Sequence, residues 1–353
     1  MKECKICTNN STVRKIEFDE NGICNYCNNY KKIESKLNDK SILQKLFENR
    51  INKIKENKEY KYDACIGISG GKDSAYVLYE AINKYNLHVK AFTMDNGFLS
   101  EKAKENIDAL VKEFNVEHEY ITFEKEFLKR VYKYSMDHWL VPCIACSYLG
   151  YASMINYTIK INAGMCIHGR SPQQMFRYYD NDVFSQFVNL GLQDIDKIDI
   201  DLEYRKILNS ISQKLNNDIM NEVKTMVFDN IQGKKLREFV PYFLYNEYDE
   251  KEIVKFLREN TKWDVGENYN HYDCKIHSVP KYIYQCAEGR AHILPEVSVL
   301  VRQGRITKQE ANEILKNEKI NKPKDEIKLL KETANINANK SIIKAKLYNL
   351  IKG

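Results

Sequence analysis

Hydrophobic and polar positions change their spacing several times along the 353 residues of the chain. Residues 31–60 place apolar side chains at helical spacing beneath a charged outer face, which predicts a helical linker. From residue 61 short apolar runs alternate with helical patterns. The expected strands contain DACIGI, HVKAFTMDNG, EHEYITF and GMCIHG, separated by helical segments such as SAYVLYEAINKY. This alternation predicts a doubly wound α/β fold, in which helices cover both faces of a parallel sheet.

The remaining segments flank or follow this α/β region. Residues 1–30 are polar and contain two cysteine pairs, which we interpret as a small metal-binding ribbon. The α/β domain is expected to cover residues 61–175. Residues 176–240 break the alternation and are predicted to form a helical insertion. Residues 241–353 are expected to complete the active site and to end in a basic tail. Ligands of a doubly wound sheet bind beyond the carboxyl ends of its strands.

Composition places the chain among globular proteins and shows where its positive charge lies. Hydrophobic residues make up 43% and charged residues 29%, which are ordinary values for a domain with a buried core. The net charge is +6, and residues 311–353 contain ten lysines against five acidic residues. Such a tail is either a solvated helix or a binding segment for an acidic partner such as RNA. Without a long apolar run or a signal-peptide pattern, we expect a cytoplasmic protein with no membrane partner.

Six residues between the first expected strand and the following helix have the composition of a phosphate-binding loop. The two glycines allow tight turns, so that successive backbone N–H groups converge on phosphate oxygens. The helix dipole and the lysine add positive potential, and the serines offer hydroxyl groups. The Walker spacing G-x-x-x-x-G-K-[ST] is absent. The candidate nucleotide-binding residues of this loop are Ser69, Gly70, Gly71, Lys72, Asp73 and Ser74.

The pattern S-G-G-x-D-S after a strand resembles the PP-loop of the ATP pyrophosphatase superfamily, also called adenine nucleotide α-hydrolase-like proteins. The resemblance covers roughly residues 62–175 and implies a sheet of the HUP/PP-loop type. It implies that the loop holds pyrophosphate, together with Mg²⁺, while ATP is cut between its α- and β-phosphates. A carbonyl-type oxygen of the acceptor would take the AMP group, and a nitrogen or sulfur nucleophile would then displace AMP.

The same resemblance assigns roles at the ends of the second and fourth strands. The second strand ends in Thr-Met-Asp-Asn-Gly, which in the family lies against adenine and makes Asp95 a candidate nucleotide-binding residue. The turn after the fourth strand places Gly169 near the α-phosphate, where Arg170 would stabilise its charge. Catalytic roles are therefore expected for Lys72, Asp73 and Arg170. His168 is either a catalytic group or a buried strand residue.

Cys4, Cys7, Cys24 and Cys27 form two C-x2-C pairs with sixteen residues between them, a spacing typical of a structural zinc site. The sequence Phe-Asp-Glu-Asn-Gly-Ile-Cys-Asn-Tyr-Cys resembles the N-terminal zinc ribbon of N-acetyl sugar amidotransferases. The segments DCKIHS and VRQGRITKQEA resemble the C-terminal portion of that family. This likeness implies a PP-loop enzyme that converts a carboxyl or acetyl-type group on a surface sugar to an amidine.

Cys143 and Cys146 lie in Pro-Cys-Ile-Ala-Cys, about 70 residues beyond the phosphate loop. Iron–sulfur-dependent tRNA thiolases of the same superfamily are similar, with a C-x-x-C at such a distance and a later third cysteine. The resemblance implies a [4Fe–4S] cluster on Cys143, Cys146 and Cys274, or with Cys286 as the third ligand, and one open iron that binds hydrosulfide. The pair is otherwise a redox pair that carries a persulfide, or two cysteines packed inside a helix.

The function that these features favour is ATP-dependent adenylation of a carbonyl-type oxygen, followed by sulfur transfer to the acceptor. One alternative is an N-acetyl sugar amidotransferase, which would need ammonia from a partner glutaminase because this chain contains no glutaminase pattern. Another is a tRNA thiolase or RNA-binding module whose ribbon and basic tail dock tRNA, although no aromatic–basic cluster of the usual kind occurs. The acceptor is therefore a small molecule, a sugar or tRNA. The other expected partners are a sulfur donor or glutaminase subunit and a second copy in a homodimer.

Overall fold

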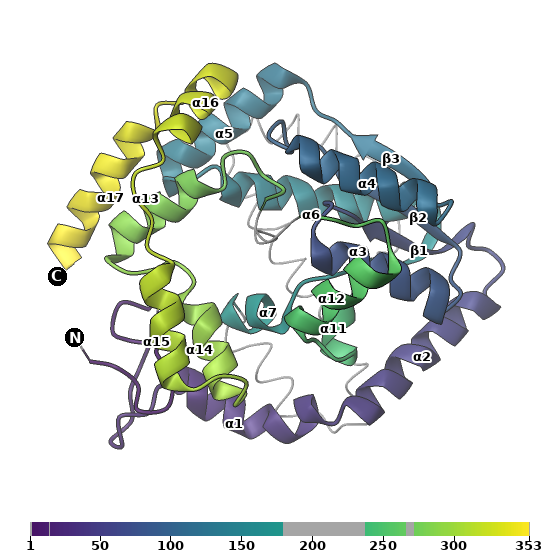
Figure 1. Ribbon diagram of the computed structural model, residues 1–353, viewed down its shortest axis with the longest axis horizontal. Helices are drawn as coiled ribbons and strands as arrows, with labels where there is room; N and C mark the ends of the chain where they lie inside the picture. The colour runs from purple at the N-terminus through teal and green to yellow at the C-terminus, as the bar shows by residue number, and fades with distance from the viewer. Residues whose placement is uncertain (1, 14, 179–236, 266–271, 353) are drawn as a thin grey trace.

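The computed structural model describes residues 2–13, 15–178, 237–265 and 272–352, and a parallel sheet lies at its centre (Figure 1). The strand order is β3-β2-β1-β4-β5, and every pairing of neighbours is parallel. The strands are β1 Tyr62–Gly67, β2 Val89–Met94, β3 Glu117–Ile121, β4 Ala163–His168 and β5 Glu238–Pro241. The predicted α/β class with a parallel sheet is thus confirmed.

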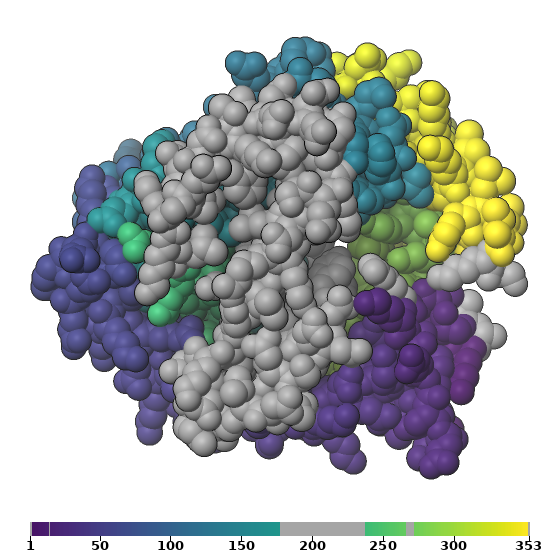
Figure 2. All heavy atoms as spheres, turned by 180° about the vertical axis from the view of Figure 1, so that it is seen from behind, coloured from purple at the N-terminus to yellow at the C-terminus, as the bar shows by residue number. Residues whose placement is uncertain are grey.

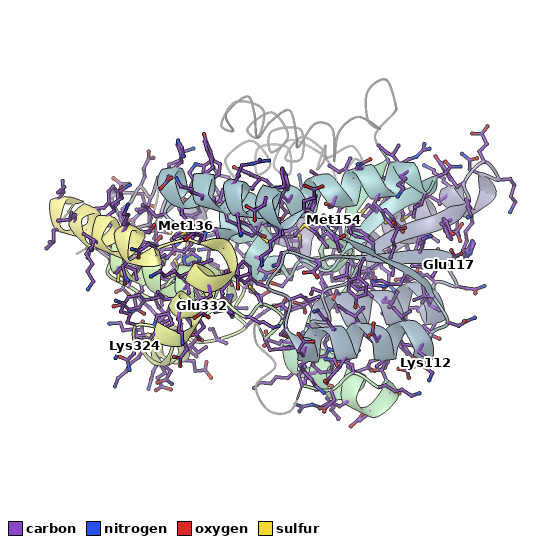
Figure 3. The ribbon with its side chains drawn as sticks, turned by 90° about the horizontal axis from the view of Figure 1, so that it is seen from above. Lys112, Glu117, Met136, Met154, Lys324 and Glu332 are labelled. Carbon is purple, nitrogen blue, oxygen red and sulfur yellow. The ribbon has the colours of Figure 1, made fainter. Side chains whose placement is uncertain are left out.

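Helices cover both faces of this sheet. In Figure 3, α6 (Cys143–Lys160) with Met154 lies above the sheet and α4 (Glu101–Glu113) with Lys112 lies below it. Strand β1 is the switch point, because β2 pairs with one of its edges and β4 with the other. In sheets of this type the crevice for the ligand opens outside the carboxyl ends of the two strands at the switch point. The loops after β1 and β4 therefore define the expected site.

The other helices fall into an N-terminal group, a group around the sheet and a C-terminal group. They are α1 Asn25–Asn38, α2 Lys40–Glu56, α3 Lys72–Tyr79 with the π-helical turn Glu80–Lys84, α5 Lys125–Trp139, α7 Pro172–Tyr178, α11 Tyr242–Tyr245, α12 Glu250–Asn260, α13 Ser278–Glu288, α14 Leu294–Arg302, α15 Lys308–Asn317, α16 Lys324–Ala334 and α17 Ala338–Lys352. Side chains cap two of the helices: Ser100 accepts from the Ala103 N–H at 3.0 Å at the start of α4, and Thr307 forms a capping box with Glu310 at the start of α15.

The strand β5 was not expected from the sequence. Its four residues Glu-Phe-Val-Pro form too short an apolar run for the alternating pattern to be recognised, although Phe239 and Val240 are buried. The helical insertion predicted for residues 176–240 falls mainly on residues 179–236, which lie outside the described residues. Within the described part of that range, residues 238–240 belong to β5.

A second apolar core joins the C-terminal helices to α5 and α6. Val141 and Ala145 pack there with Ile276, Val279 and Ala345. The helices α13 and α17 run against each other, and α16 contacts α5. Figures 1 and 2 show the yellow C-terminal helices beside the blue-green residues of α5. The basic tail is thus helical; α16 contacts α5, and α17 packs mainly on α13. No helix in the described ranges is long and apolar enough to cross a bilayer.

Candidate active site

The loop Ser69–Ser74 leaves β1 at the switch point and begins α3. Gly70 has φ +80°, and a Cβ atom there would lie 2.5 Å from the carbonyl oxygen of Ala103 in α4. Only glycine satisfies both conditions without a shift of α4. The loop also closes on itself, because the Ser69 N–H donates to Ser74 Oγ at 3.2 Å and Ser74 Oγ donates to the Gly71 carbonyl at 3.0 Å. The sequence therefore folds into a compact turn at a helix N-terminus, where backbone N–H groups attract anions.

The turn after β4 packs directly on this loop. A Cβ atom on Gly169 would lie 2.8 Å from the carbonyl oxygen of Asp73 and 3.2 Å from the Ser74 nitrogen. The two segments expected to hold the phosphates of ATP are thus brought together, as their positions after neighbouring strands require. The guanidinium of Arg170 lies over the ring of Tyr151 in α6, 5.0 Å from its centroid. This contact holds a cation beside the loop.

His168, the last residue of β4, is buried in the protein interior. Its side chain is buried against Phe239, and burial, with a smaller contribution from the Arg170 charge, lowers its pKa to about 3. The ring is therefore neutral near pH 7, and its Nδ1 accepts from the Arg170 N–H at 3.3 Å. Of the two interpretations, this environment favours the buried strand residue, which shapes the Gly169–Arg170 turn.

Lys72 and Asp73 form an ion pair in the first turn of α3. The distance from Lys72 Nζ to Asp73 Oδ2 is 3.1 Å, and the two side chains are only 13% and 19% exposed. The buried Tyr248 also lies at this carboxylate: burial raises the pKa of its phenol, and the charge of Asp73 raises it further. Asp73 is thus oriented by its neighbours and offers the oxygen ligand that Mg²⁺ prefers. Tyr248 was not identified from the sequence, since no motif marks it.

Two further aromatic residues reach the loop from the C-terminal part. Trp263 Nε1 donates to the Gly70 carbonyl at 2.8 Å, and the Tyr272 hydroxyl donates to the same oxygen. Neither was expected from the sequence, because they lie more than 190 positions beyond Gly70. The C-terminal part therefore forms hydrogen bonds directly with the backbone of the phosphate loop.

Cys143 and Cys146 lie in the first turn of α6, and Cys274 comes to them from a distant segment. Cys274 pairs with Leu99 in an antiparallel bridge, and the Ser100 N–H donates to the Asp273 carbonyl at 3.0 Å. Burial raises the pKa of the Cys143 thiol, and the neighbouring Cys146 and Cys274 raise it further. Burial similarly raises the pKa of Cys274 to about 12. The three sulfurs are therefore close enough to influence one another.

Cys286 lies in α13, where it interacts with Tyr282. The neighbours that raise the pKa of Cys143 are Cys146 and Cys274. Of the two candidates for the third ligand, the structure thus places Cys274 beside the Cys143–Cys146 pair.

The loop after β2 connects the nucleotide side of the site to these thiols. Asp95 Oδ1 accepts from the Gly97 N–H at 2.9 Å and so shapes the turn. The next residue, Asn96, directs its Nδ2 to Cys146 Sγ at 3.6 Å, and its carbonyl accepts from the Tyr132 hydroxyl at 2.7 Å. Asn96 and Tyr132 were not identified from the sequence. Their contacts make the loop at the end of β2 a common boundary of the two candidate sites.

The three cysteines near the loop after β2 offer the thiolate donors that iron–sulfur clusters use. The buried setting keeps the free thiols protonated, so that cluster binding would release protons. The residues Cys143, Cys146 and Cys274 are thus suited to hold a [4Fe–4S] cluster with one iron open.

The N-terminal cysteines form a compact group that suits a zinc ribbon. All four side chains are buried, and their sulfurs lie within 4.8 Å of one another. Four thiolates match the tetrahedral preference of Zn²⁺ and leave no open position, so the site would be structural. The ligands are Cys4, Cys7, Cys24 and Cys27.

The ribbon is docked on the C-terminal helices. Arg302 Nη1 donates to Cys7 Sγ at 3.7 Å, and the hydroxyls of Thr8 and Ser298 share a hydrogen bond of 2.8 Å. Lys308 Nζ donates to the Cys4 carbonyl at 2.7 Å. The cysteine ribbon therefore packs on α14 and on the first turn of α15.

Comparison with known proteins gives only distant likenesses. No family model and no curated protein matches the chain. Among solved structures, NH3-dependent NAD synthetase from Campylobacter jejuni subsp. jejuni NCTC 11168, in complex with the nitrate ion, is 15% identical; the match covers 55% of this chain and 96% of that one, with a TM-score of 0.31. U34-tRNA thiolase NcsA from Methanococcus maripaludis, with its [4Fe–4S] cluster, is 14% identical over 99% of this chain and 89% of that one, with a TM-score of 0.35. NMN synthetase from Francisella tularensis is 16% identical over 56% and 96% of the two chains, with a TM-score of 0.31.

These three proteins are members of the PP-loop ATP pyrophosphatase superfamily, which is the superfamily that residues 69–74 resemble.

Proposed function

We propose that this chain adenylates a carbonyl-type oxygen of an acceptor with ATP and then replaces that oxygen by sulfur. The observation that carries the proposal is the loop Ser69–Ser74 at the switch point of a parallel sheet, with the Gly169 turn packed on its first helical turn. A strand, a glycine turn and a helix N-terminus at this position form a site for a chain of phosphates.

In the first half of the reaction the acceptor oxygen attacks the α-phosphorus of ATP. The bond between the α-phosphorus and the oxygen that bridges to the β-phosphate breaks, and pyrophosphate leaves with the electron pair. The loop N–H groups and Lys72 stabilise the charge that develops on pyrophosphate, and Arg170 stabilises the α-phosphate. Mg²⁺ bound at Asp73 would neutralise further phosphate charge.

In the second half a nucleophile attacks the activated carbon, and the carbon–oxygen bond breaks so that AMP leaves with the former acceptor oxygen. Three thiols converge next to the loop that ends β2, which supports sulfur as the incoming atom. A cluster held by Cys143, Cys146 and Cys274 would supply an open iron that binds sulfide. Asn96 and the apolar residues around the thiols orient them and limit access of water.

The two halves are tested separately. Exchange of labelled pyrophosphate into ATP in the presence of candidate acceptors tests adenylation, and its absence with every acceptor class would contradict the proposal. Iron, sulfide and zinc analysis of anaerobically purified protein tests the second half. About four irons per chain are expected for a [4Fe–4S] cluster. Zinc without iron, even after reconstitution, would refute sulfur transfer by such a cluster.

A second candidate function is transfer of ammonia to a sugar, with ammonia from a partner glutaminase. The docking of the cysteine ribbon favours this candidate. Arg302 and Lys308, which contact the ribbon, lie in the segment VRQGRITKQEA, and both this segment and the ribbon resemble the sugar amidotransferases. Incubation with ATP and ammonium ions, or with ATP and sulfide, separates the two candidates. The atom that appears in the product decides between them.

A further inference from the structure

The carbonyl of Gly70 is held by two hydrogen-bond donors from the same distant segment. Trp263 Nε1 donates at 2.8 Å, and the Tyr272 hydroxyl donates to the same oxygen. Trp263 is fully buried, and burial raises the pKa of Tyr272 to about 12, so both groups keep their protons near pH 7. We refer to these two donors on the Gly70 carbonyl as the Gly70 lock.

The lock is anchored to α4. Asn106, which is 2% exposed, donates from Nδ2 to the Tyr272 hydroxyl at 2.9 Å and accepts from the Asp264 N–H at 3.2 Å. Glu113 of the same helix accepts from the Lys262 N–H at 2.8 Å. One helix therefore holds both donors of the lock, and its Ala103 carbonyl also lies against Gly70.

The orientation of one peptide plane follows from the lock. In a trans peptide the C=O and the next N–H point in opposite directions. Since the Gly70 carbonyl points to Trp263 and Tyr272, the Gly71 N–H points the other way, toward Ser69 Oγ at 3.4 Å. Glycine on both sides of this bond leaves the plane free to turn. A turned plane would direct a carbonyl oxygen, instead of an N–H group, toward a bound phosphate.

The geometry points to Trp263 and Tyr272 as positioning residues, which hold the Gly70–Gly71 peptide in the orientation that binds pyrophosphate. The inference rests on the proposed pyrophosphate site. It makes the affinity for pyrophosphate depend on the contacts that Lys262, Asp264 and Tyr272 make with α4. Adenosine carries no phosphate for the loop N–H groups to bind, so its affinity would not depend on the lock.

Calorimetry with magnesium pyrophosphate and, separately, with adenosine tests the lock on the full chain. Trp263→Phe and Tyr272→Phe each remove one donor and keep an aromatic ring. Each is expected to weaken pyrophosphate binding about three- to fivefold, the effect of one net hydrogen bond. In the double variant the affinity for pyrophosphate is expected to fall about fiftyfold, which is more than the product of the two single effects. The reason is that in each single variant the remaining donor still holds the carbonyl. Adenosine affinity should stay unchanged.

Trp139→Phe is the matched control, because Trp139 is the only other tryptophan of the chain. It should bind both ligands like the wild type. A double variant with wild-type pyrophosphate affinity, or one that loses adenosine and pyrophosphate equally, would overturn the lock. If the double variant does not fold, the single variants decide, and unchanged pyrophosphate affinity in both overturns it. A wild-type chain that binds no pyrophosphate would instead refute the proposed function, and the lock with it.

Discussion

Two constraints act on the phosphate loop at Gly70: a positive φ and a close contact with α4. Alanine variants of three glycines allow the two to be measured separately. Gly70 has a positive φ and a Cβ position 2.5 Å from the Ala103 carbonyl oxygen, so an alanine there meets both backbone strain and a clash. Gly304 has φ +67° with nothing within 4 Å, so its replacement introduces strain alone. Gly169 has no positive φ, but its Cβ would lie 2.8 Å from the Asp73 carbonyl oxygen, so its replacement introduces a clash alone.

The expected loss of unfolding free energy in each variant follows from whether it introduces strain, a clash or both. An alanine in the left-handed region costs about 1–2 kcal/mol. Overpacking against a fixed neighbour costs about 1–3 kcal/mol. The entropy that alanine removes from the unfolded chain is common to all three variants and cancels in the comparison. We therefore expect Gly70→Ala to lower the free energy of unfolding by about 2–5 kcal/mol, and each of the other two variants by roughly half as much.

Urea denaturation followed by far-UV circular dichroism measures these free energies, and calorimetry with magnesium pyrophosphate measures the consequence for the site. Gly70→Ala and Gly169→Ala should weaken pyrophosphate binding, whereas Gly304→Ala should not. Equal losses of stability in Gly70→Ala and Gly304→Ala would show that α4 does not confine the loop. Wild-type pyrophosphate affinity in Gly70→Ala would refute the assignment of the loop itself.

The remaining predictions concern charge, sulfur and protonation. Lys72→Ala and Asp73→Ala should each reduce ATP–pyrophosphate exchange by about a hundredfold or more, because each removes a charged contact to the phosphates or to Mg²⁺. Unchanged exchange in both variants, with Lys45→Ala on the exposed face of α2 as control, would contradict the site. Cys143→Ala and Cys274→Ala should leave exchange intact and stop transfer to the acceptor, whereas Cys286→Ala should affect neither; loss of transfer in Cys286→Ala alone would reverse the ligand assignment. The pKa of His168 is about 3 in the folded protein and about 6.5 in the unfolded chain, so the folded state is favoured fully only above pH 6.5. As the pH falls from 7 to 5, the unfolded chain gains a proton that the folded protein does not, and the free energy of unfolding falls by about 2 kcal/mol. His168→Gln should flatten the dependence of the unfolding free energy between pH 7 and pH 5, and a curve identical to that of the wild type would show that His168 is not buried as a neutral ring.

Local patterns predicted the strands β1 to β4 and the phosphate loop, because each depends on neighbouring residues, whereas they did not predict β5. The strand–glycine–helix signal at residues 62–79 needs no knowledge of the rest of the chain, and the N-cap of α4 at Ser100 follows from one side chain. The two C-x2-C pairs similarly specified a compact sulfur group through their spacing.

The residues that complete the site could not be found in this way. Tyr248, Trp263 and Tyr272 reach the loop through long-range packing, and no local pattern distinguishes them from the other aromatic residues of the chain. The choice between Cys274 and Cys286 also depended on tertiary structure, because the bridge between Leu99 and Cys274 forms only once the loop after β2 has its final shape.

The docking of the cysteine ribbon has a consequence for the synthesis of the protein. Thr8 and Ser298 are 290 positions apart, and Lys308 and the Cys4 carbonyl are 304 apart, so the ribbon leaves the ribosome long before the helices that support it. The ribbon can take its metal early, since its four ligands lie within 24 consecutive residues. Its binding surface on α14 and α15 exists only after these helices have been synthesised, and closing so long a loop is slow. A ribosome that stalls before residue 298 would therefore leave a metal-loaded but undocked ribbon, which makes nascent chains of increasing length a direct way to observe when the ribbon docks.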